Sequence, residues 1–572
     1  MALITRKDSS PTRIGRGLPS GGFSQAGARG GRGLYLGLGA ALGVAGAARL
    51  GRMAVEAALD RAVRILTQDA YEENWVQGLS AFSRVGMQNL FEVDLRAGDR
   101  HMLRRPLGSP KRYPGLDRLM FSFAQLDPLP TPADWSVNTR VVIGPYADYP
   151  LEIDLPVMVG GMGYGVSLSK EAKIAIARGA TLAGTATNTG EGPFLPEERA
   201  AAEKLVVQYH RGNWMPLEAL EQADMVEIHV GQGASGSVGS KLPPEKVTRR
   251  LTREMGLAPG EPAFVASTFE ELAQGKGLAP IVDRARYLSG GRPVVVKLAA
   301  SHRLEKDLAV CLKAGVDGVV IDGAQAGTGQ APPIVQDDFG IPTLYALLRA
   351  RKFLDRHDPE RRVSLIVSGG LVTPGDFLKC LALGADAVYA GTAILLALMA
   401  GQQHKATPGE PPTQVITYQG KRRGLFSIEK GAENVGNFLL ACRDEIEHAV
   451  RQLGKDDVRA VDRSDLCALD DEIARITGLP VAYAAEAGGG GAGAGGRGDA
   501  PDDYGYRESD AQGDDYARGD AGGERDGYVQ GDPYGRDYEM SVGYGAGRAR
   551  RERADGGRPG AGTGRPRGRR RG

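Results

Sequence analysis

Two glycine-containing segments have the composition of phosphate-binding loops. The first, Ser368-Gly369-Gly370-Leu371, follows a short apolar run, and a helix is predicted to start soon after it at Pro374. The second, Gly391-Thr392, follows the next apolar run and opens another predicted helix. Glycine lets a backbone come close to a phosphate, and the amides of a helix N-terminus donate hydrogen bonds to it. Tight turns alone would explain one such loop, but two in succession favour a phosphate site.

A lysine, Lys297, interrupts the apolar segment 294–298. An unpaired buried ammonium is costly, so this side chain must face something polar. The carboxylate of Glu227, also inside an apolar run, is one partner and would make a structural ion pair. Negative charge on a bound cofactor is the other partner that we consider.

The elements that must position these residues are short apolar runs separated by segments of helical composition. Such runs are typical of parallel strands that are buried on both faces. Helices are predicted at 170–178, 305–313 and 374–383. The eight strand candidates are 157–159, 180–183, 205–207, 226–230, 294–298, 318–321, 364–367 and 387–390.

Eight strand–helix units predict an α/β protein with a TIM (β/α)8 barrel. The glycine-rich segment 160–165 superficially suits an open doubly wound sheet, but its spacing is not G-x-G-x-x-G. In a barrel, the two glycine loops follow strands seven and eight, where phosphate sites are common. The long segments 231–293 and 323–363 also follow strands, so we expect them at the active-site face.

The chain divides by composition into five predicted parts. Residues 1–32 form a disordered arm, 33–68 an apolar and amphipathic helical segment, and 69–150 an extension that packs on the barrel. Residues 151–483 form the barrel with its C-terminal helices. Residues 484–572 form a disordered Gly/Arg/Asp/Tyr-rich tail, because they lack the aliphatic residues that offset chain entropy.

The composition also bears on where the protein is located in the cell and on what it binds. The apolar stretch 34–48 is shorter than the roughly 20 residues of a membrane-spanning helix. We therefore expect a cytoplasmic protein and leave open a weak membrane association through 34–48.

The formal net charge is +1, and acidic residues interrupt the tail's Tyr and Arg residues, so we predict no specific nucleic-acid partner. The four cysteines (Cys311, Cys380, Cys442 and Cys467) form no C-x-x-C pair, which favours reduced, mostly buried thiols. We predict no metal site and no iron–sulfur cluster.

An ordered set of motifs gives the chain a family resemblance. Over roughly residues 90–480 it resembles the FMN-binding domain of glutamate synthase, in the archaeal-type or stand-alone form. Each motif is weak alone, but the ordered set is specific. The motifs are Met162-Gly163-Tyr164-Gly165-Val166-Ser167-Leu168-Ser169, Thr187-Asn188-Thr189-Gly190-Glu191-Gly192, Glu227-Ile228-His229-Val230-Gly231-Gln232-Gly233-Ala234, Lys241-Leu242-Pro243, Val296-Lys297-Leu298, Asp322-Gly323-Ala324-Gln325-Ala326-Gly327-Thr328-Gly329, Ser368-Gly369-Gly370-Leu371 and Gly391-Thr392-Ala393.

The resemblance implies FMN as the cofactor and gives each motif a role. Residues implied to contact the flavin ring are Gly161, Met162, Gly163, Thr187, Asn188, Gln232 and Lys297. Residues implied to surround the phosphate are Gly327, Thr328, Gly329, Gly369, Gly370, Gly391 and Thr392. Glu191 and Lys297 are the implied catalytic residues, with Glu191 orienting ammonia or acting as general acid or base. The alternative is that Glu191 has no catalytic role and caps the N-terminus of the helical segment 196–199.

The implied reaction is reductive amination of 2-oxoglutarate to L-glutamate by hydride from reduced FMN. The family's amidotransferase domain and its cysteine cluster have no counterpart in this sequence, and residues 395–425 contain no cysteine. We therefore expect separate amidotransferase and electron-donor subunits. The segment Gln208-Tyr209-His210-Arg211 also departs from the family's S-G-R-F-G pattern, which puts the residues that clamp 2-oxoglutarate in doubt.

Three other functions remain open from the sequence. The chain could be a flavin subunit like that of N-methylglutamate synthase, in which only the amine differs. It could be an FMN-dependent dehydrogenase of another small substrate, with a base chosen from His210, His229 and His302. It could also be a non-catalytic scaffold that acts through its tail.

Overall fold

The computed structural model describes residues 31–71, 74, 76–100, 102–329, 331–406 and 414–484. The chain divides into two units, Met1–Gly488 and Gly489–Gly572. The second unit lies outside the described residues. The predicted tail therefore falls outside the described part of the chain apart from residue 484, and the predicted arm falls outside it apart from residues 31–32.

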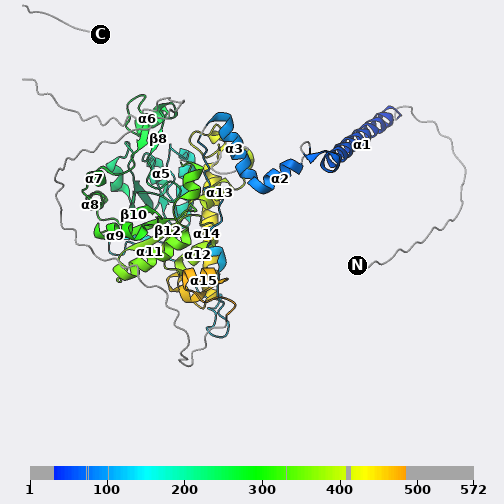
Figure 1. The fold of residues 1–572 in the computed structure, drawn as a ribbon. Coiled ribbons are helices and arrows are strands. Elements are labelled where there is room, and N and C mark those ends of the chain that lie inside the picture. Colours follow the sequence, from blue (N-terminus) through cyan, green and yellow to red (C-terminus); the bar gives the residue numbers. More distant parts are fainter. Residues whose placement is uncertain are drawn as a thin grey trace, which may run out of the picture. The chain divides into compact units, whose positions relative to one another are not determined.

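The core is one sheet of eight parallel strands that closes into a barrel (Figure 1). Neighbouring strands follow the order β4-β13-β12-β11-β10-β7-β6-β5. The two strands at the ends of this order also meet, because the amide of Val159 in β4 donates to the carbonyl of Ala186, just before β5. The strands are β4 (Val157–Val159), β5 (Thr187–Asn188), β6 (Leu205–Tyr209), β7 (Met225–His229), β10 (Val294–Ala299), β11 (Gly318–Asp322), β12 (Ser364–Ser368) and β13 (Ala387–Ala390).

The predicted (β/α)8 barrel is confirmed, and the open doubly wound sheet is excluded by the closure. One predicted strand is wrong. Residues 180–182 belong to the helix α4 (Lys170–Leu182), and the second strand is the two-residue β5. The run 180–183 is apolar because this end of α4 packs on α14 (Ile428–Gln452), where a Cβ on Gly179 would lie 2.6 Å from Val435.

Helices that follow the strands surround the barrel in Figure 1. Several of these helices begin at a residue whose side chain caps them. The Ser169 side chain accepts a hydrogen bond from the amide of Ala172 at the start of α4, and the Thr373 side chain accepts one from the amide of Asp376 at the start of α12. The remaining helices of the barrel are α5 (Pro196–Ala201), α8 (Ala279–Leu288), α9 (Leu304–Lys313), α11 (Thr343–His357), α12 (Pro374–Ala382) and α13 (Thr392–Met399).

The two long loops predicted at the active-site face carry structure of their own. The loop after β7 contains an antiparallel pair, β8 (Ser240–Leu242) with β9 (Ala263–Val265), and the helices α6 (Arg249–Glu254) and α7 (Glu270–Ala273). The segment after β11 contains α10 (Pro333–Asp338). Tyr164, Leu251 and Val265 form a second small apolar cluster beneath the first of these loops.

Segments before and after the barrel pair with each other. Strand β1 (Leu119–Phe121) pairs with β14 (Leu466–Ala468) in this way. Strands β2 (Val141–Ile143) and β3 (Leu151–Ile153) both precede the barrel and pair with each other, and both pairs are antiparallel. The other helices are α1 (Gly31–Gln68), α2 (Val76–Val85), α3 (Met87–Asp99) and α15 (Asp471–Thr477). Among the described residues, no helix is long and apolar enough to span a membrane. The predicted domain boundaries stay predictions.

Candidate functional site

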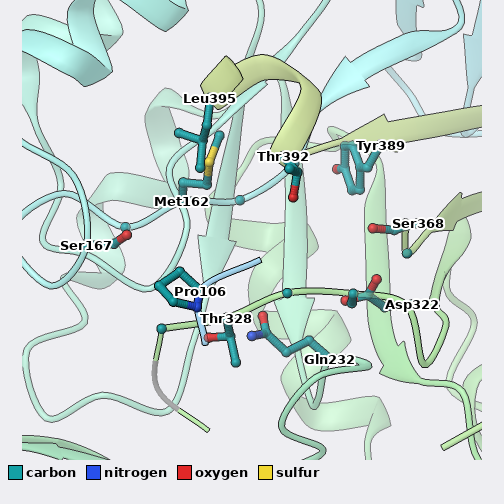
Figure 2. A pocket seen from close by; sticks show the side chains of 18 of the residues that line it. Pro106, Met162, Ser167, Gln232, Asp322, Thr328, Ser368, Tyr389, Thr392 and Leu395 are labelled. Atoms are coloured by element: carbon teal, nitrogen blue, oxygen red, sulfur yellow. The ribbon is translucent and has the colours of Figure 1, made fainter. Parts of the chain in front are cut away.

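A pocket opens at the carboxyl ends of the barrel strands (Figure 2). Residues from the ends of β4, β10, β11, β12 and β13 line it together with Pro106 from the N-terminal extension. All the predicted site residues line this pocket except Thr187 and Asn188. In the close-up, Thr392 and Thr328 lie at the pocket wall with Met162 and Gln232. The sequence thus located the pocket, and the structure shows which groups face it.

The N-terminus of α13 is open toward an anion. Gly391 is its N-cap residue, no side chain caps the helix, and a Cβ on Gly391 would meet no atom within 4 Å. The free amides of the first turn therefore remain available as donors. The start of α12 differs: Thr373 and Asp376 form a capping box that uses its first amides and adds a negative charge. The start of α13 is therefore the more open of the two toward an anion.

Gly369 and Gly370 sit between β12 and α12 in a conformation that requires glycine. Their φ angles are 114° and 73°. A Cβ on Gly369 would lie 2.7 Å from Oγ1 of Thr343, which itself donates to the Gly369 carbonyl. A side chain here would be strained and would displace Thr343. At the glycine pair, the wall of the pocket therefore consists of backbone atoms without side chains.

Lys297 points from β10 into a group of buried carboxylates. Its Nζ lies 3.7 Å from Oδ2 of Asp322, so its ion-pair partner is Asp322 and not the predicted Glu227. Burial would lower the pKa of Lys297, but the charges of Asp322, Glu227 and Glu191 outweigh it and raise that pKa. Nζ also lies 5.9 Å from the centre of the Tyr389 ring. Lys297 is therefore a buried cation at the floor of the pocket.

Two of the residues predicted to contact the flavin ring, Thr187 and Asn188, lie outside the pocket lining. Both side chains are fully buried in β5 and do not line the pocket. The Asn188 amide donates to Glu227 at 3.0 Å, and Gln208 donates to the same oxygen at 2.7 Å. Asn188 thus helps to hold Glu227, the acceptor of Gln208, and Gln208 does line the pocket.

Several residues that line the pocket were not predicted from the sequence: Gln208, Asp322, Ser368 and Tyr389. Asp322 is informative, because its Oδ2 accepts from the amide of Gly233 while Oδ1 is buried with no hydrogen-bond partner among the described residues. Gln208 and Asp322 had a visible signal. Each is a polar residue inside or at the end of an apolar run, like Lys297.

Glu191 faces a histidine. Its Oε1 lies 2.7 Å from Nδ1 of His229, and both side chains are largely buried. Burial would raise the pKa of Glu191, but His229 and, farther away, His210 and Arg211 outweigh it and bring that pKa to about 2. The residue does not cap α5, whose N-cap is Leu195 without a side-chain hydrogen bond. Glu191 is therefore a fixed negative charge at the pocket.

None of the three histidines considered as catalytic bases lines the pocket. His302 is exposed in the loop after β10. His210 is buried, with Nδ1 accepting from the amide of Gly212 at 3.0 Å and Nε2 lying 3.4 Å from the carbonyl of Gly192. Both of its ring nitrogens are thus engaged with backbone.

A pH dependence of stability follows from His210. Burial lowers its pKa to about 4, from 6.5 for the unfolded chain. The unfolded chain binds this proton more readily than the folded chain. The free energy of unfolding should therefore decrease as the pH falls from 6.5 toward 4, by about 3 kcal/mol at most. We expect His210→Asn, which keeps an acceptor for Gly212, to flatten this part of the profile. Thermal melting across this pH range measures it, and parallel profiles for the two proteins would contradict the assignment.

A barrel with open anion donors at α13 and a buried lysine at the floor of the pocket defines a class of cofactor-binding α/β barrels. Comparison with known families specifies the class further. Residues 134–456 match the conserved region in glutamate synthase. The chain therefore belongs to the glutamate synthase family of oxidoreductases.

Individual relatives agree with this assignment. The glutamate synthase large subunit-like protein of Rhizobium meliloti is 31% identical over 398 residues, which cover 66% of this chain and 90% of that protein. The archaeal-type glutamate synthase [NADPH] of a Thermotoga species is 33% identical over 56% of this chain, and the match spans only 63% of that relative. The archaeal glutamate synthase [NADPH] of Methanocaldococcus jannaschii is 30% identical, over 58% of this chain and 66% of the relative.

Among solved structures, an active chimera of (S)-mandelate dehydrogenase is similar at 16% identity, with a TM-score of 0.41. The likeness covers 62% of this chain and 88% of the other.

Proposed function

We propose that the chain binds FMN in the barrel pocket and is the flavin-containing part of a glutamate synthase-type oxidoreductase. The observation that carries this proposal is the pairing, in one pocket, of open anion donors at α13 with the buried Lys297 at the floor. A phosphorylated cofactor with a ring that gains negative charge needs both. The family match and the archaeal-type glutamate synthase relatives support the same assignment.

The residues present fit this cofactor. Gly391 and the first amides of α13 would hold the phosphate, with Gly369 and Gly370 allowing close approach of the backbone. Gln232 and Lys297 would face the ring, and the buried Oδ1 of Asp322 offers an acceptor that no described residue uses. FMN bound in this way would supply a hydride to an imine carbon.

The protein groups near the substrate then have distinct tasks. Lys297 stabilises negative charge on the ring side of the pocket, because it stays protonated among its carboxylates. Glu191, ionised at neutral pH, orients an ammonium or iminium group by charge and has no proton to donate there. Its proposed role is therefore the orienting one of the two that the family resemblance implies.

The proposed reaction is reductive amination of 2-oxoglutarate to L-glutamate, with ammonia and electrons supplied by partner proteins. The test is glutamate formation by the purified chain with chemically reduced flavin, 2-oxoglutarate and ammonia. Methylamine in place of ammonia distinguishes an N-methylglutamate synthase-like subunit. Failure of every amine would contradict the reaction, and a colourless purified protein that takes up no FMN would contradict the cofactor and favour the scaffold function.

A charge placed at the start of α13 tests the phosphate site. We expect Gly391→Asp to weaken FMN binding by about tenfold or more, since the new carboxylate would repel the phosphate. Gly391→Ala adds only a methyl group, which would meet no atom within 4 Å, and it should bind FMN within about threefold of the wild type. Titration of apoprotein by flavin fluorescence measures both. Equal affinities of the two variants would place the phosphate elsewhere.

A further inference from the structure

A second pocket lies at the opposite, amino-terminal end of the barrel strands. Its floor is the loop 383–386, which leads into β13 (Ala387–Ala390). Strand β2, helix α11 and the segment 458–463 supply its walls. The first pocket lies at the far end of the same β13, so the two pockets are separate sites.

Arg351 of α11 enters this second pocket as a buried cation. Its side chain is 7% exposed, and its Nε lies 2.7 Å from Oδ1 of Asp355. Neither Nη1 nor Nη2 has a hydrogen-bond partner among the described residues. Buried guanidinium donors are rarely left without acceptors, because their desolvation is costly. Two free donors in one plane match the two oxygens of a carboxylate or phosphate.

The floor is shaped around this guanidinium. Gly384 has a φ of 101°, and a Cβ there would lie 2.6 Å from Cδ of Arg351. Asp386 is near enough to feel the charge of Arg351, but its Oδ2 accepts from the amide of Leu365 at 2.7 Å. The stem of Arg351 thus lies along bare backbone and its head faces the cavity.

The rest of the lining narrows the class of ligand. Apolar walls come from Val141, Leu381, Leu383, Val458 and Val461, which are buried. The charged lining residues are four arginines (Arg351, Arg361, Arg459, Arg463) and three aspartates (Asp355, Asp386, Asp462). The three carboxylates beside the arginines would repel a phosphate dianion more strongly than a monoanion. The walls suit a short hydrocarbon portion.

We propose that this pocket is a second ligand site, which binds a small aliphatic monocarboxylate through a bidentate contact with Arg351. This inference does not depend on the proposed flavin chemistry. The carboxylate would pair with Nη1 and Nη2, and its alkyl portion would contact the valine and leucine walls.

Calorimetric titration of the full chain with isobutyrate tests the site. We expect saturable binding, with the Kd raised about tenfold or more in Arg351→Met. Arg351→Lys keeps the stem and the charge beside Asp355 but lacks the paired donors, so its binding should also weaken. Arg349→Met is the matched control, because Arg349 lies on the same helix, pairs with Glu305 and does not line the pocket.

Two further measurements separate this site from the first pocket and from an anion site of another kind. Glu191→Gln should bind isobutyrate as the wild type does, whatever its effect on catalysis. The proposal is wrong if the wild type shows no saturable binding, or if both Arg351 variants keep the wild-type Kd. Inorganic phosphate that binds more tightly than isobutyrate, and only when Arg351 is present, would overturn the carboxylate assignment.

Discussion

Replacing Lys297 with methionine should lower the stability of the folded chain by about 3–5 kcal/mol and weaken FMN binding by about tenfold or more. The loss of stability follows because Asp322, 3.7 Å from Nζ, and the buried Glu227 would lose their nearest cation. The loss of cofactor affinity follows because no other lysine lines the pocket among the described residues. Thermal melting of apoprotein and flavin titration measure the two effects separately.

The surrounding carboxylates allow a sharper version of this experiment. Lys297→Met combined with Asp322→Asn should recover part of the lost stability, since one uncompensated charge is gone, while FMN affinity stays low. Lys313→Met, at the exposed end of α9, is the control and should change neither quantity. Unchanged flavin binding in Lys297→Met would assign the lysine to structure alone.

The barrel was predictable because its strands carry a strong signal. Most of them are short, almost wholly apolar runs, and they are buried on both faces as such runs predict. The second strand could not be recognised in this way, since β5 has two polar residues and lies next to an apolar helix end. Packing of Gly179 on Val435, which no local pattern reveals, decides that 180–182 is helix.

The site residues were predictable where a residue type in its sequence context has one usual structural role. Paired glycines after strands and a lysine inside a strand all lead to the pocket. The role of Asn188 was not predictable, because a short buried amide can face a ligand or support a neighbour, and only the position of Glu227 decides between them. The pattern Thr373-x-x-Asp376 can indicate that a helix caps itself, and the predicted phosphate site at the start of α12 did not take it into account.

The largest effect on catalysis is expected from Glu191→Gln. The variant keeps the size of the side chain but removes a carboxylate that is ionised at neutral pH, with a pKa of about 2. We expect glutamate formation to fall by about 100-fold or more, with FMN affinity within about threefold of the wild type. Steady-state assays with reduced flavin, alongside flavin titration, separate the two quantities.

A nearby glutamate provides the control for this prediction. Glu197 pairs with Lys170 at 2.5 Å and does not line the pocket, so Glu197→Gln should leave glutamate formation unchanged. Because the folded-state pKa of Glu191 is depressed, its stabilising contribution is present above the unfolded value of 4.5 and is lost as the pH falls toward 2. Glu191→Gln should remove that acid-sensitive step from the melting profile. An unaltered profile together with full activity would show that the Glu191–His229 pair serves neither stability nor catalysis.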